Sequence, residues 1–315
     1  MTLRQFTTSV PPAIGAAMEE FEKEFTYPLG SSGRFRIRHG PDYLRFFQAM
    51  GESMLLVAEN EGRVLGSIMR VKRRIIRSGE SVEVIEAHYL CDLKLRGTSR
   101  GSRVLARLIR ETKIAIEADE STACYCVVMA GTGRLPTDYT GRLGVPEFQR
   151  LADITILRLS GGTEESLKSH VVDEHEFESV HSRIVQPGFR AARGKSKLRS
   201  AMEPVHLIAS GDACGILEDT RLGKRLILES GDELLSAHLS AFKYRNPESA
   251  ASVLKHAVGL ARANSTPAVF VAIPDRELPL LRPFLSGLDV TEAPAVVYGH
   301  GFEVGENWWI DTAEI

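Results

Sequence analysis

A single stretch decides the fold of this chain: Leu93-Lys94-Leu95-Arg96-Gly97-Thr98-Ser99-Arg100-Gly101-Ser102-Arg103-Val104-Leu105. A run typical of a β-strand, 82–95, leads into it, and a run typical of a helix, 104–113, leads out of it. The loop between the two runs consists of Gly, Ser, Thr and Arg. Free backbone N–H groups at the start of a helix, small side chains and arginines together suit a bound phosphate. The stretch therefore predicts a strand, an anion-binding loop and a helix in succession.

The composition bounds the class of protein. The chain has 315 residues, of which 43% are hydrophobic and 25% charged, which is ordinary for a globular protein of about two domains. Its formal net charge of −2 argues against a general nucleic-acid binder, which usually carries a basic surplus. No apolar run reaches the roughly 18–20 residues of a membrane span, and residues 1–12 lack the apolar segment of a signal peptide. We therefore expect a cytoplasmic protein without nucleic-acid or membrane partners, whose oligomeric state stays open.

The cysteines indicate buried, reduced thiols rather than a metal site. Three of the four lie in apolar, strand-like runs. Cys124 and Cys126 are too close in sequence for the usual zinc pair, and no histidine cluster lies near them. We therefore expect no metal. The four residues are Cys91, Cys124, Cys126 and Cys214.

Hydrophobic periodicity predicts a mixture of strands and helices. The apolar run at 123–130 is continuous, as in strands that pair in parallel and are buried on both faces. Residues 188–197, GFRAARGKSK, are small, basic and rich in turn formers, and we expect them to form an exposed linker or loop. Helices are predicted at 13–26, 43–50 and 104–113, and strands at 35–38, 55–59, 64–71, 82–95, 123–130 and 154–159.

The second half of the sequence repeats the first, weakly but in order. The matching segments lie at an offset that stays near 150 residues: Ala87-His88 with Ala237-His238, Lys94 with Lys243, Arg96 with Arg245, and Val104-Leu105 with Val253-Leu254. The repeat predicts two tandem copies of one fold, at 1–160 and 205–315, with a connecting segment at 161–204.

The two copies differ at the anion-binding loop. Where the first has Thr98 to Arg103, the second has Pro247 to Ser252, without glycine or arginine. Glu248 adds a carboxylate where a phosphate would lie. We therefore expect the first copy to bind a polyphosphate and the second to be degenerate.

In the spacing between its strand and its loop, the opening stretch resembles the GNAT superfamily of N-acetyltransferases. In that superfamily a strand written Leu-x-Val-x-x-x-x-Arg-Gly runs into a loop that holds the pyrophosphate of coenzyme A, and Leu93 to Gly101 matches this spacing. Tyr139, followed by Leu143-Gly144, matches a second family position. Arg103 and Leu105 depart from the pattern, because the family has small residues there. The resemblance implies the α/β fold class, with an α+β mixed sheet, in two tandem GNAT-like acyl-CoA N-acyltransferase domains.

The resemblance also implies a chemistry: transfer of an acetyl or other acyl group from coenzyme A to an amine by direct attack. Backbone N–H groups of the strand near its end would polarise the thioester carbonyl, and those of the loop would hold the pyrophosphate. The alternative is an ordinary strand-to-helix turn with solvated arginines. The implied strand residues are Leu93, Lys94 and Leu95, and the implied loop residues are Arg100, Gly101, Ser102, Arg103 and Val104.

Three residues are candidates for proton transfer. Tyr139 stands at the family position of the general acid that protonates the thiolate, or is a packing tyrosine. Tyr89 stands where the family often has a glutamate base. Glu86 lies on the other face of the strand and serves only if a bulge reverses the alternation of side chains. For both Tyr89 and Glu86 the alternative is a purely structural role.

Three functions stay open at this point. The first is acetyl-CoA-dependent N-acetylation of a small-molecule or peptide amine. The second is a non-catalytic, GNAT-like module that binds a ligand or a partner protein. The third is a transferase that takes a long acyl chain from an acyl carrier protein. The sequence decides neither the acceptor nor the length of the acyl chain.

Overall fold

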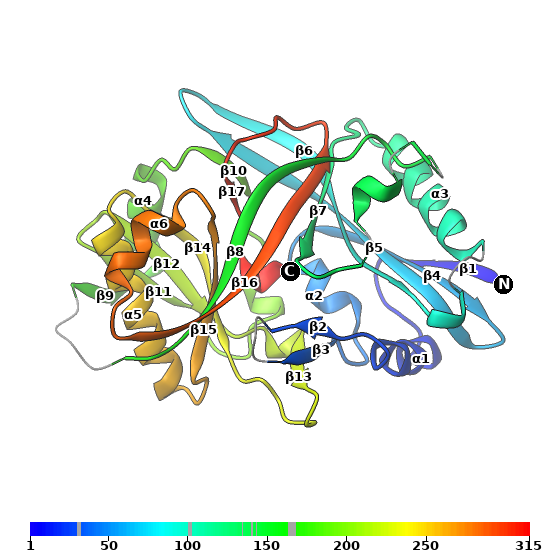
Figure 1. The fold of residues 1–315 in the computed structure, drawn as a ribbon, viewed down its shortest axis with the longest axis horizontal. Helices are drawn as coiled ribbons and strands as arrows, with labels where there is room; N and C mark the ends of the chain where they lie inside the picture. Colours follow the sequence, from blue (N-terminus) through cyan, green and yellow to red (C-terminus); the bar gives the residue numbers. More distant parts are fainter. Residues whose placement is uncertain (30–32, 100–102, 134, 140, 143, 163–167) are drawn as a thin grey trace.

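One twisted β-sheet runs through the whole molecule in the computed structural model, and helices cover both of its faces (Figure 1). The structure describes all residues except 30–32, 100–102, 134, 140, 143 and 163–167. Over these described residues, fourteen strands form the large sheet and three more form a small one. No helix among them is long and apolar enough to cross a bilayer.

The large sheet follows the order β1-β4-β5-β6-β7-β16-β8-β15-β14-β12-β11-β9. The strands that come early in the chain are β1 (Thr2–Phe6), β4 (Glu52–Asn60), β5 (Arg63–Ser78), β6 (Val82–Leu95), β7 (Cys124–Met129) and β8 (Gln149–Gly161). The later ones are β9 (Ser169–Val172), β10 (Gly188–Ala191), β11 (Val205–Ala209), β12 (Ala213–Glu218), β14 (Ala237–Tyr244), β15 (Ala268–Pro274), β16 (Leu288–His300) and β17 (Trp308–Trp309).

The small sheet and the helices complete the fold. The small sheet joins β2 (Tyr27–Pro28), β3 (Arg34–Arg38) and β13 (Arg225–Leu228), so that a strand of the second half pairs with one of the first. The helices are α1 (Pro12–Glu22), α2 (Leu44–Gln48), α3 (Val104–Glu117), α4 (Glu174–Arg183), α5 (Pro247–Ala263) and α6 (Leu278–Leu281). Strand β6 begins and ends where the periodicity predicted it.

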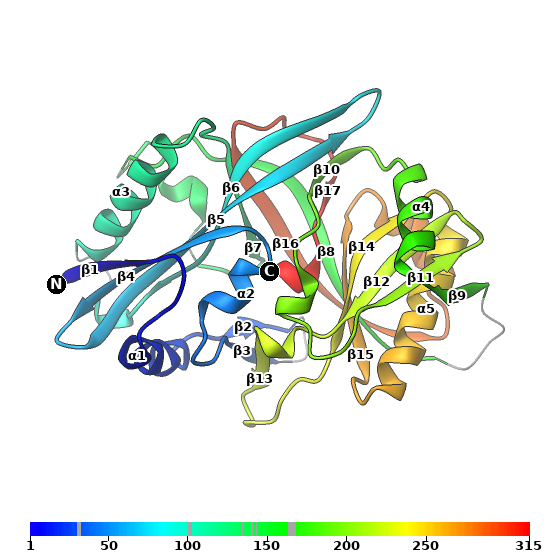
Figure 2. The same cartoon turned by 180° about the vertical axis from the view of Figure 1, so that it is seen from behind.

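The two halves of the chain share the centre of the sheet. Strand β16, from the last part of the chain, pairs with β7 of the first half, and β8 of the first half pairs with β15 of the second. Figure 2 shows the same crossing from behind. The division of the chain at 160 and 205 stays a prediction, and strands on both sides of it contribute to each half of the sheet.

Apolar spacing on α3 explains how this helix covers the sheet. Val104 and Leu108 lie one turn apart, so their side chains share one face. Both are buried against Leu56 and Ile68, on β4 and β5. The helix therefore holds its first turn against the sheet, beside the end of β6.

The expectation of an exposed linker at 188–197 is wrong for its first four residues. Gly188–Ala191 forms β10, which pairs with β5 and with β17. Phe189 is buried and its ring lies 5.0 Å from that of Trp308. Arg190, which made this segment look solvated, donates a hydrogen bond to the Phe242 carbonyl. Long-range aromatic packing, which local composition cannot register, decides the structure here.

Candidate active site

Strands β6 and β7 form a V. Over the described residues, they pair in parallel at two positions, the second of which joins Tyr89 to Tyr125. Beyond this pair, no hydrogen bond between described residues joins 90–95 to 126–129. Since α3 follows β6, the first turn of α3 lies near the open end of the V (Figure 1).

A β-bulge bends β6 inside the V. Asp92 and Leu93 of β6 lie opposite a single residue of β5, Ile68, because the register shifts there. Asp92 has a φ of 53°, in the left-handed region that few residues other than glycine adopt. A bulge turns backbone groups out of the regular ladder. It also lets the Leu93 side chain point outward, 45% exposed, while the next residue, Lys94, is buried.

The second half contains a similar V, which the chain itself closes. Strands β14 and β15 also pair in parallel at two positions, ending with His238 and Phe270, and Ala241 forms a bulge with a φ of 49°. The backbone N–H of Ala241 donates to a carboxylate oxygen of Asp311 at 3.0 Å. The hydroxyl of Thr312 donates to the Phe270 carbonyl at 3.1 Å. Residues near the end of the chain thus bridge the two strands of this V.

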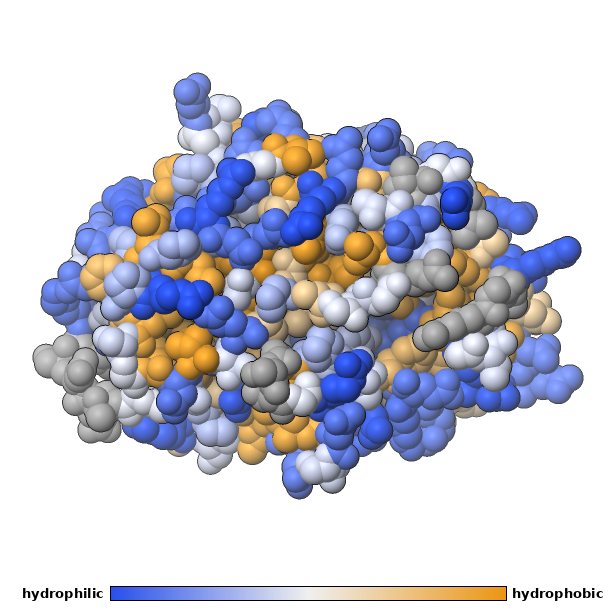
Figure 3. Space-filling model, in the orientation of Figure 1, coloured by the Kyte–Doolittle hydropathy of each residue, from blue (hydrophilic) through white to orange (hydrophobic). Residues whose placement is uncertain are grey.

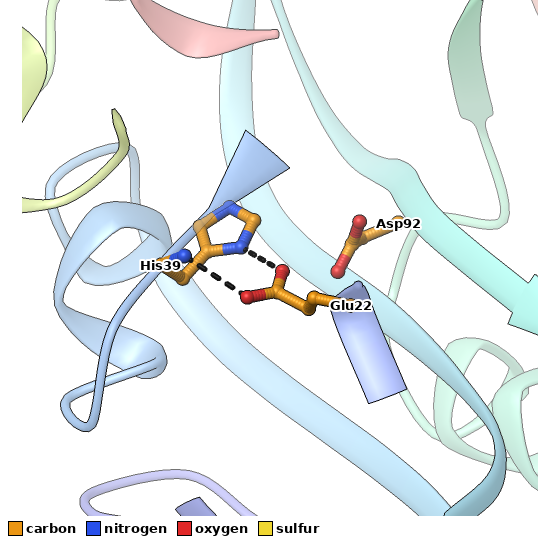
Figure 4. Close-up of side chains that lie close together, drawn as sticks. All are labelled: Glu22, His39 and Asp92. Carbon is orange, nitrogen blue, oxygen red and sulfur yellow. Dashed lines mark hydrogen bonds and ion pairs between the residues drawn. The ribbon is translucent and has the colours of Figure 1, made fainter. Parts of the chain in front are cut away.

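A buried polar network holds the bulge of the first V in place. Figure 4 shows Glu22 of α1 and His39, which follows β3, next to Asp92. The Glu22 carboxylate contacts Nδ1 of His39 at 2.6 Å and accepts from its backbone N–H at 3.0 Å. The Lys94 ammonium bridges the carboxylates of Glu22, at 3.0 Å, and of Asp92, at 2.6 Å. The Tyr43 hydroxyl donates to the other Asp92 oxygen.

Glu22 and Lys94 of this network are held in their charged forms. Burial disfavours the charged form of Glu22, but His39 and Lys94 outweigh it and lower the Glu22 pKa to about 2. Burial likewise disfavours the charged form of Lys94, but Asp92, together with Tyr27 and Glu22, raises the Lys94 pKa above its usual range. Opposite charges at close range stabilise one another where water cannot screen them.

The same carboxylates and imidazole are the ligand types of a metal site. Glu22, His39 and Asp92 each offer one possible ligand atom, and these three atoms lie within 4.8 Å of one another. The Lys94 ammonium already pairs with both carboxylates, so the positive charge that a metal would supply comes from the chain itself. This arrangement favours an ion-paired anchor for the bulge over a metal centre.

The three predicted proton-transfer residues differ in their surroundings. Tyr89 is buried at the closed end of the V, and its ring stacks on Tyr125 with 4.9 Å between centroids. Burial raises the pKa of the Tyr89 phenol well above its usual value. Glu86 is exposed on β6 opposite Arg74, before the V opens. Tyr139 is half-buried at the end of a short 3-10 helix.

The predicted cofactor-binding residues divide into three groups. Leu93, Lys94 and Leu95 lie at the bulge and the end of β6, but the Lys94 side chain is taken up by its ion pairs. Val104 is buried at the start of α3, where it packs against the sheet and lines the cavity beside the loop. Of the predicted loop residues, Arg103 is exposed at the N-cap of α3, and Arg100, Gly101 and Ser102 lie outside the described residues.

A basic cavity of about 660 Å³ adjoins this loop. Thr98 and Ser99 line it from the loop, and Arg103, Arg107 and Arg110 line it from α3. The three arginines share one face of the helix because they are spaced by four and three residues. All three are exposed. Arg107 and Arg110 continue the basic character of the loop along the helix, which reasoning from the loop sequence alone did not identify.

A second cavity, of about 500 Å³, lies at the end of β7. Met129 of β7 and the next residue, Ala130, line it on one side, residues 290–294 line it from β16, and Pro28 lines it from the small sheet. Apolar side chains reach the surface near the middle of this face of the molecule, where β16 crosses it (Figure 3). The first cavity thus lies beside the loop that follows β6, and the second lies at the end of β7.

The polar network escaped prediction from sequence. Its one signal is Glu22, a carboxylate four residues after Met18 on the apolar face of α1, next to Phe21. A charge at such a position indicates a buried partner. Its partners His39 and Tyr43 lie on other elements, and no spacing in the sequence connects them to Glu22.

No family model matches the sequence, and no curated protein is similar to it. Solved structures resemble its fold. Saccharomyces cerevisiae N-myristoyltransferase with bound myristoyl-CoA and inhibitors has a TM-score of 0.62 and 8% identity, over 99% of this chain and 83% of that enzyme. Eis1 from Mycobacterium abscessus has a TM-score of 0.50 and 9% identity, over 94% of this chain and 73% of Eis1.

These likenesses, together with the V and the bulge, define the class of fold. The chain has the mixed α/β GNAT fold in a two-domain arrangement. The prediction made from the strand, loop and helix at 82–113 is therefore confirmed for the fold. At 8% and 9% identity the likeness extends no further than architecture.

Proposed function

We propose that this protein is an N-acyltransferase that moves an acyl group from coenzyme A to an amine, in the V between β6 and β7. The observation that carries the proposal is the contrast between the two V-shaped strand pairs. Asp311 and Thr312 bridge the V of the second half, whereas among described residues no hydrogen bond bridges the first. The first half of the chain therefore contains the open V, the loop predicted to bind an anion and the basic cavity.

The second V supports a role for the bulge of the first. The N–H of Ala241 faces a carboxylate oxygen at 3.0 Å, so a bulge at this position presents a donor to a negatively charged oxygen. Asp92 occupies the matching bulge in β6. A thioester carries a carbonyl on which charge develops during attack by an amine, and a fixed backbone N–H near Asp92 or Leu93 would stabilise that charge. The buried ion pairs of Asp92 and Lys94 hold this donor rigidly.

The basic cavity would hold the phosphates of the donor. The N-terminus of α3 carries partial positive charge, and Arg103, Arg107 and Arg110 add full charges along one face. Yeast N-myristoyltransferase, whose fold this chain shares, binds myristoyl-CoA, which supports an acyl-CoA as the donor. We propose acetyl-CoA as that donor, and the bound myristoyl-CoA of the yeast enzyme favours a long-chain acyl-CoA as the second candidate.

The proposed roles in proton transfer follow from how accessible each candidate side chain is. Tyr139 is the proposed acid for the leaving thiolate, since its side chain is not sealed in the core. Glu86 is the more accessible of the two proposed bases, and the packed Tyr89 would act only through a water molecule. Both Asp92 oxygens are engaged by Lys94 and Tyr43, so this carboxylate positions the bulge instead of moving a proton. No covalent enzyme intermediate is needed.

Binding and turnover test the proposal separately. Thermal shift with acetyl-CoA and with myristoyl-CoA at about 100 times their dissociation constants should raise stability by roughly 2.7 kcal/mol for the true donor. Calorimetric titration should give one site per chain, because the second V is closed. Release of free thiol in the presence of amines then shows transfer. A chain that binds neither donor at millimolar concentration is not a coenzyme A enzyme, and one that binds a donor without thiol release is a ligand-binding module.

A further inference from the structure

Strand β16 has an open edge in the middle of the sheet. Along one side it pairs with β8 continuously from Leu288 to Val297. Along the other side it pairs with β7 only from Ala295 onward, and Ala130 adds one more hydrogen bond, from its N–H to the Pro294 carbonyl at 2.8 Å. Over the described residues, no strand pairs with 288–293 on that side.

Backbone geometry shows which groups face the open edge. Successive residues of a strand direct their N–H and C=O to alternate sides. Because the Pro294 carbonyl points toward β7, the backbone groups of Glu292 and Val290 point the same way. Both residues line the cavity of about 500 Å³ at the end of β7. Among the described residues, neither one has a backbone partner on this side.

The chain itself shows what fits this edge. Strand β7 lies on it in antiparallel fashion up to Met129, and Ala130 follows in line. The chain then turns away at Gly131, which has a φ of 84°. A second strand laid in the line of β7 would therefore meet the free groups of Glu292 and Val290, each of which can exchange two hydrogen bonds with an opposite residue.

We propose that the open edge of β16 binds the acyl acceptor as an extended peptide, which continues the line of β7. Strand addition of this kind uses main-chain hydrogen bonds for affinity. A peptide antiparallel to β16 runs in the direction of β7, so its amino terminus lies next to Ala130, at the end of a strand of the V. The acceptor amine is thus the N-terminal amine of the peptide. This inference rests on the proposed function, which it deepens by naming the acceptor class.

Proline substitutions test the edge without touching the rest of the sheet. Val290→Pro and Glu292→Pro each remove an N–H that faces the open edge, whereas the pairing with β8 uses the opposite side. Val290→Ala and Glu292→Gln are the matched controls, because they change the same side chains and keep the N–H. An unchanged melting temperature identifies the proline variants that retain the fold.

Two pools of acceptors separate peptide recognition from amine chemistry. The first is a mixed-sequence pool of tetrapeptides with free amino termini, and the second a pool of single amino-acid amides, each assayed with acetyl-CoA and myristoyl-CoA. We expect kcat/KM for the peptides to exceed that for the amides, and each proline variant to lower the peptide value about fivefold to tenfold. The amide value should change less than twofold in the same variants.

Hydrogen exchange gives a readout that does not depend on turnover. The amides of Val290 and Glu292 should exchange more slowly when the peptide pool is present. If the protein transfers acyl groups to both pools equally well, or the proline variants match their controls, the peptide edge is refuted and the proposed function stands. If neither pool is acylated, the proposed function fails, and unprotected amides at 290 and 292 then refute the peptide edge as well.

Discussion

At the scale of single residues, Lys94 shows how far a side chain can differ from what its sequence position suggests. It stands in a motif that pointed to a cofactor, yet its ammonium is buried between Glu22 and Asp92. The bulge at Asp92 reverses the alternation of β6, so Lys94 turns inward and Leu93 outward. Its backbone belongs to the candidate site, while its side chain stabilises the strand that carries the site.

Loss of the Lys94 charge should therefore destabilise the protein strongly. Lys94→Met leaves two buried carboxylates close together without a cation, and removal of one member of such a network costs about 3–5 kcal/mol. Urea unfolding followed by circular dichroism measures the change. The exposed pair of Lys23 with Glu20 supplies the control, since Lys23→Met should cost less than about 1 kcal/mol. Equal effects of the two substitutions would show that the network stabilises nothing.

At the scale of elements, strand β6, its bulge and helix α3 form one unit. The helix places three arginines along one face, beside the loop at which β6 ends. Sequence reasoning identified the strand, the loop and the helix of this unit, but not the bulge, because the strand period, the small residues of the loop and the helix period follow one another within about thirty residues. The second half keeps the strand and the helix, but has lost the basic loop.

The arginine face of α3 should contribute to donor binding through charge. Arg107→Glu reverses one charge in the basic cavity and should raise the dissociation constant of acetyl-CoA about tenfold, with a weaker effect at high salt, because exposed charges are screened. Titration calorimetry at two salt concentrations measures both effects. Lys197→Glu makes the same charge change on an exposed residue outside the cavity. Equal dissociation constants for the two variants would remove α3 from the donor site.

At the scale of the whole molecule, the second half contains a V that its own residues bridge, and it shares the large sheet with the first half. Its V is bridged by Asp311 and Thr312, and its strand β16 inserts between β7 and β8. Two histidines after residue 160 are largely shielded from water. Burial, followed by the charges of Lys224 and Arg199, lowers the pKa of His238 well below its usual value. Burial and Lys243 lower that of His181 to about 3.

These histidines should make the fold sensitive to acid. Both are neutral in the folded state, while the unfolded chain binds their protons below about pH 6.5. Stability is therefore complete above pH 6.5 and falls as the pH drops toward the folded pKa values. Between pH 7.5 and 5.0 each histidine contributes a loss of about 2 kcal/mol. Burial and the charge of Glu314 raise the pKa of Asp311 to about 6. Asp311 therefore acts in the opposite sense and offsets part of the loss of stability.

Urea unfolding at pH 7.5 and pH 5.0 measures this dependence. His238→Gln keeps a polar group for Thr220 and Thr312, which contact the two ring nitrogens, but removes the titration. Its stability should change with pH by about 2 kcal/mol less than that of the unsubstituted protein. His175→Gln is the control, because His175 is exposed. A pH dependence that is the same in all three proteins would exclude His238 as its source.

The sequence by itself determined the local structure, which depends on residues that are neighbours in the chain. The period of β6 and α3 and the glycine and arginine loop between them predicted a strand, a loop and a helix, because such preferences act within a few residues. The weak repeat predicted two copies of one fold, and the resemblance of the motif at Leu93 to Gly101 implied the GNAT fold. Only the tertiary structure decided the rest. The bulge at Asp92 depends on Glu22 and Tyr43, far away in sequence, and the closure of the second V depends on Asp311. Such contacts arise from long-range packing of buried charges and hydrogen bonds, which require partners that no local pattern specifies.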